Sequence, residues 1–295
     1  MSELIYIAET LRACAEIASN PSNDKSAVRS LLGLDDFQDY EYTDAFVLEI
    51  VPDSAVFLSD EAVLGGEPTE RVVGFHRVLG MENIADPTGL VGQLQYYASL
   101  LSEIVERQSD PESLEILNKI RSSYLFEHVL VWLPMYASYL EHIFPKLKSW
   151  AGAIIDVFEN EAIENQVNNW DILPSALATR PTLRDVGADA GLDVFASPFI
   201  TGFIVSKSLL RKLGSKYEVP PRFGTRKFML SSMFQQDGDA TLELLGEVAT
   251  TQLQMWTALE ASIGTSARSW RINAEISIEE INSGRAELLS RFSDS

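Results

Sequence analysis

Residues Phe126 to Leu140, FEHVLVWLPMYASYL, form the stretch of sequence that decides the fold. Its apolar and aromatic side chains recur at the three- and four-residue spacing of a helix, which places Trp132 and Tyr136 on one face. A proline is tolerated in the first turn of a helix and disrupts the interior, so Pro134 starts or kinks this helix. The stretch therefore predicts a helix with one aromatic face.

Helical periodicity extends over most of the rest of the chain. Two stripes of apolar residues have the spacing of a helix face. The first stripe comprises Leu90, Leu94, Tyr97, Leu101, Ile104 and Val105, and the second comprises Leu242, Leu245, Ala249, Trp256, Leu259 and Ile263. The one strand-like run, AFVLEIV over Ala45–Val51, is too short and isolated to set up a sheet. Because strands do not alternate with helices, we expect an all-α fold.

Residues that break helices divide the chain into roughly ten helical segments. Examples are the pairs Pro52-Asp53, Asp86-Pro87 and Asp110-Pro111. The chain has no internal repeat and no low-complexity linker. We expect a single multi-helix, bundle-like domain over residues 1–275, and leave open a shallow subdivision near residues 105–125. Residues 276–295 are expected to form a short amphipathic helix that ends in a loose tail.

Individual residues predict where some helices begin and end. The pair Gly65-Gly66 predicts the C-terminal cap of a helix, and Asp239 in the segment DGDAT predicts an N-cap. Pro145 predicts a break in the helical segment that follows Leu140. Cys14, the single cysteine, lies on the apolar face of the first helix without a cationic neighbour in sequence, so we expect a buried structural thiol.

The chain is strongly acidic, with a formal charge of −20 at pH 7 and a pI near 4.5. Such a surface repels nucleic acid and anionic membranes, so neither is expected as a partner. It favours cationic partners or simply maintains solubility, and both interpretations stay open. No apolar run approaches the roughly 20 residues of a membrane span, and the acidic N-terminus does not resemble a secretory signal. We expect a cytoplasmic protein without stable membrane insertion.

Two segments concentrate charge of one sign. Asp35–Glu49 contains six acidic residues and no basic one, and Lys207–Lys227 contains seven basic residues opposed only by Glu218. Runs of this kind are commonly solvated faces. The functional alternative is a site for a basic peptide in the first segment, and contact with an acidic or phosphate-bearing partner in the second.

The sequence offers little support for catalysis. The three histidines, His76, His128 and His142, lack metal-ligand spacing, and the single cysteine cannot form a cysteine-rich metal site. Motifs for a nucleophile elbow, a phosphate-binding loop or a dinucleotide-binding turn are missing. Carboxylates are too numerous for any pair to indicate acid–base chemistry. We expect a protein that is not an enzyme and that holds no metal or cofactor.

Three groups of residues resemble the TorD/DmsD/NarJ family of redox-enzyme maturation chaperones. The first runs from Ser54 to Phe75 and includes Ala-Val-Phe-Leu, Leu-Gly-Gly-Glu and Arg-Val. The second is Asp86-Pro87 at the start of an apolar helix, and the third is Glu127-His128 followed by Trp132-Leu133-Pro134 and an aromatic residue. The likeness is clearest from Asp53 to Phe158. One departure is that the family's Asp-His after the proline is Thr88-Gly89 here, so no role of that pair is carried over.

The resemblance implies an all-helical cytoplasmic chaperone that binds the twin-arginine signal peptide of a molybdopterin-containing oxidoreductase, the apo form of that subunit, or both. A receptor for such a leader needs carboxylates for the guanidinium groups and an apolar groove for the rest. On this basis we assign peptide binding to Phe57, Leu58, Val63, Leu64, Asp86, Leu90, Glu127, His128, Trp132, Pro134 and Tyr136.

Several alternatives stay open at this point. Each assigned apolar residue is equally explained by core packing, and Glu127-His128 by a polar pair at the edge of the core. The protein could instead assemble a molybdoenzyme that has no leader and faces the cytoplasm, as NarJ-like members do. A small-molecule enzyme that uses Glu127-His128 is a further alternative. The sequence does not distinguish a monomer from a homodimer, and it does not identify the client.

Overall fold

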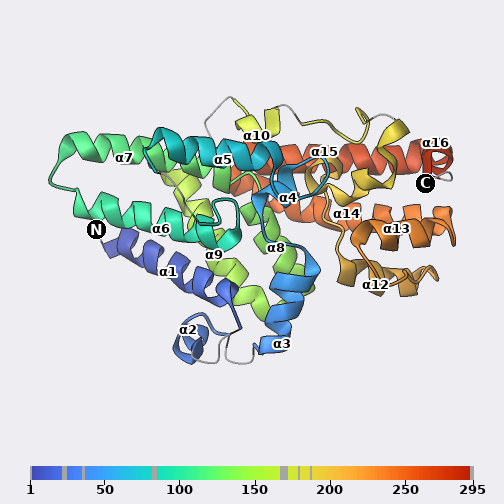
Figure 1. Ribbon diagram of the computed structural model, residues 1–295, viewed down its shortest axis with the longest axis horizontal. Coiled ribbons are helices and arrows are strands. Elements are labelled where there is room, and N and C mark those ends of the chain that lie inside the picture. The colour runs from blue at the N-terminus through green and yellow to red at the C-terminus, as the bar shows by residue number, and fades with distance from the viewer. Residues whose placement is uncertain are drawn as a thin grey trace.

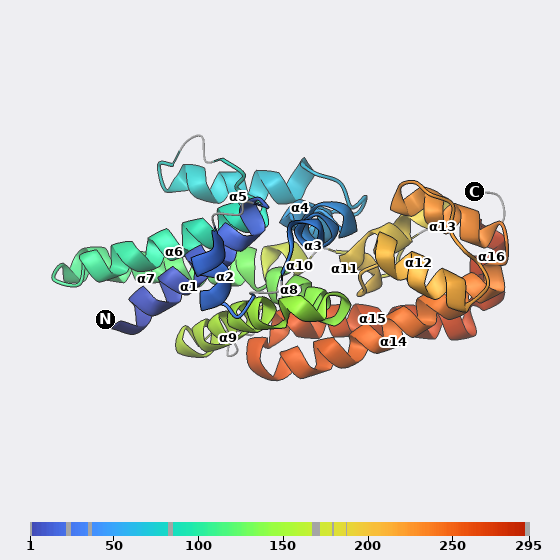
Figure 2. The same ribbon diagram turned by 90° about the horizontal axis from the view of Figure 1, so that it is seen from below.

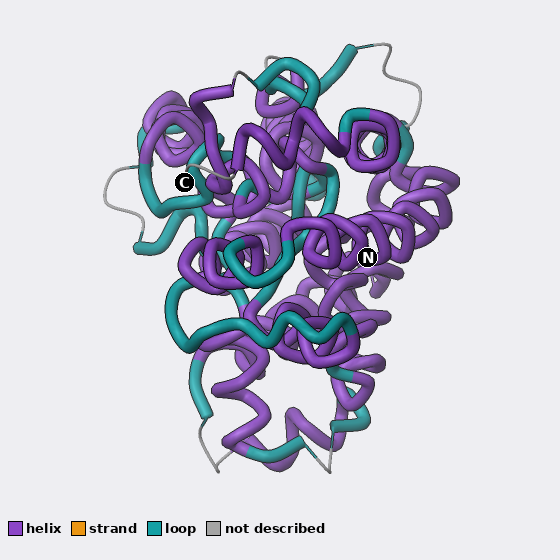
Figure 3. Tube along the Cα trace, turned by 90° about the vertical axis from the view of Figure 1, so that its right-hand side faces the viewer, coloured by secondary structure: helices purple, strands orange, loops and turns teal. Residues whose placement is uncertain are grey.

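The computed structural model describes residues 2–21, 25–34, 37–81, 85–166, 172–178, 180–186 and 188–292. The fold is all-α and a single domain, 75% helical, with sixteen α-helices and no strand among these residues (Figure 3). The α-helices are α1 (Ser2–Ser19), α2 (Ser26–Leu31), α3 (Asp39–Tyr42), α4 (Ser54–Leu58), α5 (Gly66–Val78), α6 (Leu90–Glu106), α7 (Pro111–Tyr124), α8 (Leu133–Ile143), α9 (Lys148–Glu164), α10 (Ser175–Ala178), α11 (Pro198–Thr201), α12 (Lys207–Lys216), α13 (Arg226–Phe234), α14 (Gly238–Ile263), α15 (Thr265–Ser283) and α16 (Arg285–Phe292).

Four further helical segments are named as well: the π-helices η2 (Thr43–Glu49) and η3 (Leu125–Val129), and the 3-10 helices η4 (Pro145–Leu147) and η6 (Ala188–Ala196). The helices form an elongated molecule (Figure 1). The α6–α7 hairpin lies at one end, with α1 packed along α6, and α12, α13 and α16 lie at the other end. No described helix is long and apolar enough to cross a membrane.

The core consists of two hydrophobic clusters joined by α14 and α15. The larger cluster contains most apolar residues up to α10, together with Trp256 of α14 and Trp270 of α15. The second cluster is built from η6 through α14, and it takes Leu242 of α14 and Ile281 of α15. The two long helices run antiparallel along one side of the molecule, so they link both halves (Figure 2). The subdivision considered near residues 105–125 stays a prediction.

Both apolar stripes and the break at Pro145 are confirmed. Every residue of the second stripe is buried within α14, and of the first stripe in α6 only Val105 is partly exposed. Helix α8 ends at Ile143, and α9 begins at Lys148 after the 3-10 turn at Pro145. Cys14 is fully buried, and burial raises the pKa of its thiol to about 12, as expected of a structural cysteine.

The strand-like run Ala45–Val51 sets up no sheet, as expected, and forms no strand at all. Residues Thr43–Glu49 continue α3 as the π-helix η2, and Ile50, the residue after it, adopts an extended conformation. Burial follows a helix rather than a strand, because the neighbours Ala45 and Phe46 are both buried while Val47 is exposed. With no described strand to pair with, the backbone hydrogen bonds of this segment are satisfied within the helix.

One predicted helix end is wrong, and another is misplaced by two residues. Gly65 and Gly66 start a helix instead of ending one: Gly65, at φ 87°, precedes α5, whose first residue is Gly66. The segment before them forms a turn, so there is no helix for the pair to cap. The N-cap of α14 is Asp237, whose carboxylate accepts a hydrogen bond from the Ala240 amide at 3.0 Å, while Asp239 lies in the first turn.

The C-terminal segment differs from the expectation for residues 276–295. Residues 276–283 complete α15, and a separate helix, α16, covers Arg285–Phe292. The expected loose tail at residues 293–295 lies outside the described residues. The number of helices exceeds the predicted ten because several, such as α10 and α11, have only four residues and no periodicity that a sequence could reveal.

Candidate binding groove

An apolar groove of about 340 Å³ opens on the surface between η2, the loop before α5, and the first turns of α12 and α13. Five of its aliphatic side chains are 45–62% exposed, namely Val47, Leu48, Val51, Val63 and Leu64. Large aliphatic side chains that gather on an exposed concave surface are typical of a binding site.

Two local structures present these side chains. The π-helix η2 turns Ala45 and Phe46 into the core, which leaves Val47 and Leu48 on the surface. On the other side, the loop Ser59–Gly65 is held by the Ser59 hydroxyl, which accepts a hydrogen bond from the Val63 amide at 3.1 Å. Ala45 and Phe46 anchor η2 in the core, and the Ser59 carbonyl anchors the loop by accepting a hydrogen bond from the buried Ser197 hydroxyl at 2.8 Å, so the apolar wall is formed before any ligand arrives.

One end of the groove is polar. Lys207 and Arg226, the first residues of α12 and α13, line it together with Thr225, whose side chain caps α13. The Arg226 guanidinium donates to the carbonyls of Ala196 and Val205 at 3.2 Å each, and burial lowers its pKa. These contacts hold Arg226 in place as a wall of the groove.

Glu49, which also lines the groove, has a buried carboxylate that forms a polar centre at this end. It is 3% exposed and accepts hydrogen bonds from the hydroxyls of Tyr139 at 2.6 Å, Ser208 at 2.5 Å, and Ser206. Glu49 thereby ties η2 to α8 and to the start of α12. All three hydroxyls contact Oε1, and Oε2 accepts only from the Ser208 amide at 3.4 Å, so the carboxylate holds these three elements together mainly through one oxygen.

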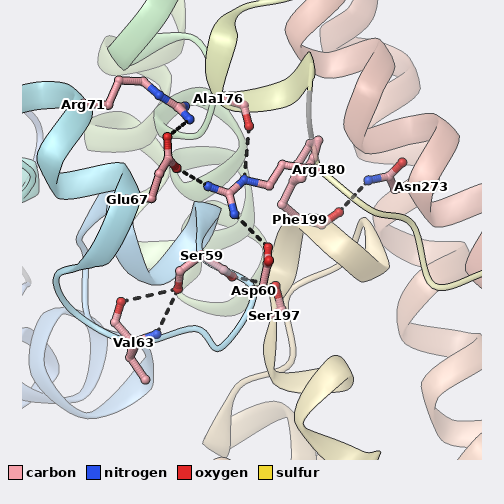
Figure 4. A network of polar contacts seen from close by, with 10 residues as sticks. All are labelled: Ser59, Asp60, Val63, Glu67, Arg71, Ala176, Arg180, Ser197, Phe199 and Asn273. Atoms are coloured by element: carbon pink, nitrogen blue, oxygen red, sulfur yellow. Dashed lines mark hydrogen bonds and ion pairs between the residues drawn. The ribbon is translucent and has the colours of Figure 1, made fainter. Parts of the chain in front are cut away.

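A cluster of charged groups lies on the loop Ser59–Gly65 and on α5 (Figure 4). The Arg180 guanidinium donates to the carboxylates of Asp60 at 2.7 Å and Glu67 at 2.6 Å, and to the Ala176 carbonyl at 3.3 Å. Arg71 also pairs with Glu67. Only 9% of the Arg180 side chain is exposed, against 57% for Asp60 and 58% for Glu67. A largely buried guanidinium is therefore covered by two accessible carboxylates.

Two other carboxylates beside the groove are exposed. Asp44 lies on η2 three residues before Val47, and Glu61 precedes the groove residue Ala62. Neither forms an ion pair with another described residue within 4.0 Å. They therefore provide negative charge at the margins of an apolar surface.

Of the residues assigned to peptide binding from the sequence, Val63 and Leu64 lie in the groove. Phe57 is fully buried below it, and its ring centroid lies 5.2 Å from that of Trp132 and 5.4 Å from that of Tyr136. A peptide could reach these three rings only if α4 and α8 separated. The same applies to the other assigned residues buried in these helices and in α6, which are Leu58, Leu90 and Pro134.

Glu127 and His128 have different partners. The Glu127 carboxylate accepts a hydrogen bond from the Ser175 amide at 2.8 Å and so anchors α10. His128 is 4% exposed and packs against Phe75 and Tyr124, with ring centroids 4.9 and 5.3 Å away. Burial lowers the pKa of His128 to about 3, with smaller effects of nearby His76 and Arg71, so its imidazole is neutral at pH 7.

Asp86 is exposed and adopts a left-handed conformation with φ 51° before α6. Its carboxylate lies directly over Gly89, where a Cβ atom would come within 2.1 Å of it. Thr88 donates to the buried Asp53 carboxylate at 2.8 Å. These contacts give the Asp86–Gly89 turn a role in joining α4 to α6.

The two charged segments are partly neutralised within the chain. Lys216 pairs with Glu247 and Lys227 with Asp193, both at 2.5 Å. In the acidic segment, Asp39 pairs with Arg29 and Glu41 with Lys146. Asp35 and Asp36 lie outside the described residues. Most of the charge in both segments therefore belongs to local ion pairs or to solvated surface.

Sequence reasoning missed four residues at this site. Val47, Leu48 and Val51 have the i, i+1, i+4 spacing of one helix face, a signal that was read as part of a strand. Arg180 gave no signal, because it lies more than 100 positions from Asp60 and Glu67 in sequence and meets them only through the fold.

Searches against protein-family models, curated proteins and solved structures found no match for this chain. In the described part of the chain, no group of three or more His, Cys, Asp or Glu side chains could hold a metal ion. The groove is thus the feature on which a functional argument rests.

Proposed function

We propose that this protein is a peptide-binding chaperone that takes an apolar segment of a partner polypeptide into the groove. The observation that carries this proposal is the set of five half-exposed aliphatic side chains around one concavity. Covering the exposed half of each gains roughly 1 kcal/mol, or about 5 kcal/mol in total before the cost of ordering the peptide. That gain suits reversible capture.

The segment that fits best has arginines beside its apolar part. Support comes from the net charge of −20 and from Asp44 and Glu61 at the groove margin. It also comes from the resemblance of the sequence motifs to the TorD/DmsD/NarJ chaperones. We therefore propose that the client is a molybdopterin-containing oxidoreductase subunit with a twin-arginine leader, held in the cytoplasm during maturation.

Calorimetric titration with a synthetic peptide tests this proposal. The peptide carries two adjacent arginines followed by an apolar stretch, and a second peptide has lysines in their place. We expect micromolar binding of the first peptide, weaker binding of the second, and at least a tenfold loss in the Leu48→Asp and Leu64→Asp variants. A tenfold loss corresponds to about 1.4 kcal/mol.

The matched control is Ile116→Asp, because Ile116 is 53% exposed on α7, outside the groove. This variant should bind like the unaltered protein. Equal loss in all three variants, or no binding of either peptide, contradicts the proposal. Capture of the apoenzyme without its leader would then favour assembly of a leaderless client.

A further inference from the structure

We propose that Asp60 and Glu67 form a guanidinium-binding subsite that Arg180 occupies in cis, and that an arginine of the bound peptide displaces it. The inference rests on the proposed function and extends it from the apolar groove to a specific charged contact. The site is the pair of carboxylates together with the Ala176 carbonyl (Figure 4).

The geometry is that of a receptor for a planar cation. The two carboxylates come from different elements, the loop Ser59–Gly65 and α5, and they meet two different nitrogens of one guanidinium, Nη1 and Nη2. Nε of the same group meets a carbonyl oxygen. A lysine ammonium is a compact point charge and does not present donors in this fixed fork. The subsite therefore selects arginine over lysine.

The subsite and the groove share the loop Ser59–Gly65. Asp60 lies two residues before Ala62, and Val63 and Leu64 follow in the same loop, so one short segment carries both the acidic and the apolar contacts. An extended peptide advances about 3.3 Å per residue. A few residues are therefore enough to connect an arginine in the subsite to apolar side chains in the groove.

Arg180 can be displaced without unfolding its segment. The preceding helix α10 is anchored independently, since Ala176 and Leu177 are buried in the main core and the Ser175 amide donates to Glu127. The two carboxylates are more than half exposed, although only 9% of the Arg180 side chain is, so a ligand's arginine can approach both carboxylates from solvent. A ligand's arginine that reaches these carboxylates then competes with Arg180 for them, while α10 keeps its place.

Binding of the diarginine peptide to an Arg180→Gln variant tests the displacement. Removing the internal competitor should tighten binding by between about 2-fold and 30-fold, the range expected for two ion pairs whose carboxylates are exposed. The dilysine peptide should gain less. Arg184→Gln is the control, because Arg184 is exposed and pairs with Glu279 and Glu280. Unchanged or weaker peptide binding by Arg180→Gln, with the diarginine peptide still bound in the groove, overturns the inference.

A second measurement does not depend on peptide binding. Millimolar guanidinium ion should raise the thermal midpoint of an Arg180→Ala variant, because the ion refills the vacated subsite. The same addition should not raise the midpoint of the unaltered protein, whose subsite is already occupied by Arg180. Adding Asp60→Asn and Glu67→Gln should abolish this rescue. Rescue without peptide binding would reject the proposed function and keep the subsite, whereas no rescue rejects the subsite.

Discussion

Acidification should destabilise this protein through His128, and the size of the effect follows from its surroundings. The imidazole is 4% exposed among aromatic rings, and burial lowers its pKa from 6.5 to about 3. Between these two values the unfolded chain binds a proton at this position and the folded protein does not. Stability therefore rises with pH across this range, and is lost as pH falls below 6.5.

The expected loss between pH 7 and pH 5 is about 2 kcal/mol from His128 alone. Both pH values lie above the folded pKa, so the result depends mainly on the unfolded value. His76, which packs in the same cluster, also has a lowered pKa because of burial and adds an effect of the same sign. The protein as a whole should lose more than His128 contributes.

Urea unfolding at the two pH values measures this contribution as a difference between variants. His128→Phe keeps the ring shape and removes the titrating group, so it should lose about 2 kcal/mol less than the unaltered protein on going from pH 7 to pH 5. His142→Gln is the control, because this imidazole is exposed. The reasoning is refuted if His128→Phe and the unaltered protein show the same pH dependence.

Two further predictions concern stability. Glu161 is fully buried and pairs with Arg121, so Glu161→Ala should lower the free energy of unfolding in urea by about 3 kcal/mol. The double variant Arg121→Met with Glu161→Leu should recover most of this loss, because it leaves no unpaired buried charge. An additive loss in the double variant would contradict the account. Gly202 has φ 71° and a Cβ there would lie 2.1 Å from a backbone nitrogen of α15, so Gly202→Ala should lower the thermal midpoint by several degrees. Gly74→Ala, in a helix with open space around it, should raise the midpoint slightly, and equal effects at both sites would contradict this reading.

The sequence predicted those parts of the fold that depend on repeated, local patterns. The stripes of α6 and α14 follow from periodicity, and the start of α8 near Pro134 follows from proline chemistry. These features are present in the folded structure. The run Ala45–Val51 was misread because a short apolar segment rich in β-branched residues suits a strand or a buried helix equally well. Contact with the core, which the sequence does not show, selects the π-helix.

The candidate site was predictable only in part. Val63 and Leu64, assigned through the family resemblance, line the groove, while Trp132 and Tyr136 were assigned to the same surface and lie in the core. Large aromatic residues at helix spacing are equally expected in both settings, so the pattern alone could not separate them. Arg180 depends on a contact between distant segments, and one sequence contains no information on that pairing.

The central claim is that a partner peptide lies in the groove between η2 and the loop before α5. Photocrosslinking tests it most directly, with a benzoylphenylalanine placed at position 64 and, as a control, at position 116 on α7. The account predicts that the diarginine peptide crosslinks from position 64 and that excess unlabelled peptide competes it away. Crosslinking of equal strength from position 116, or none from position 64 under conditions where the peptide binds, would contradict it.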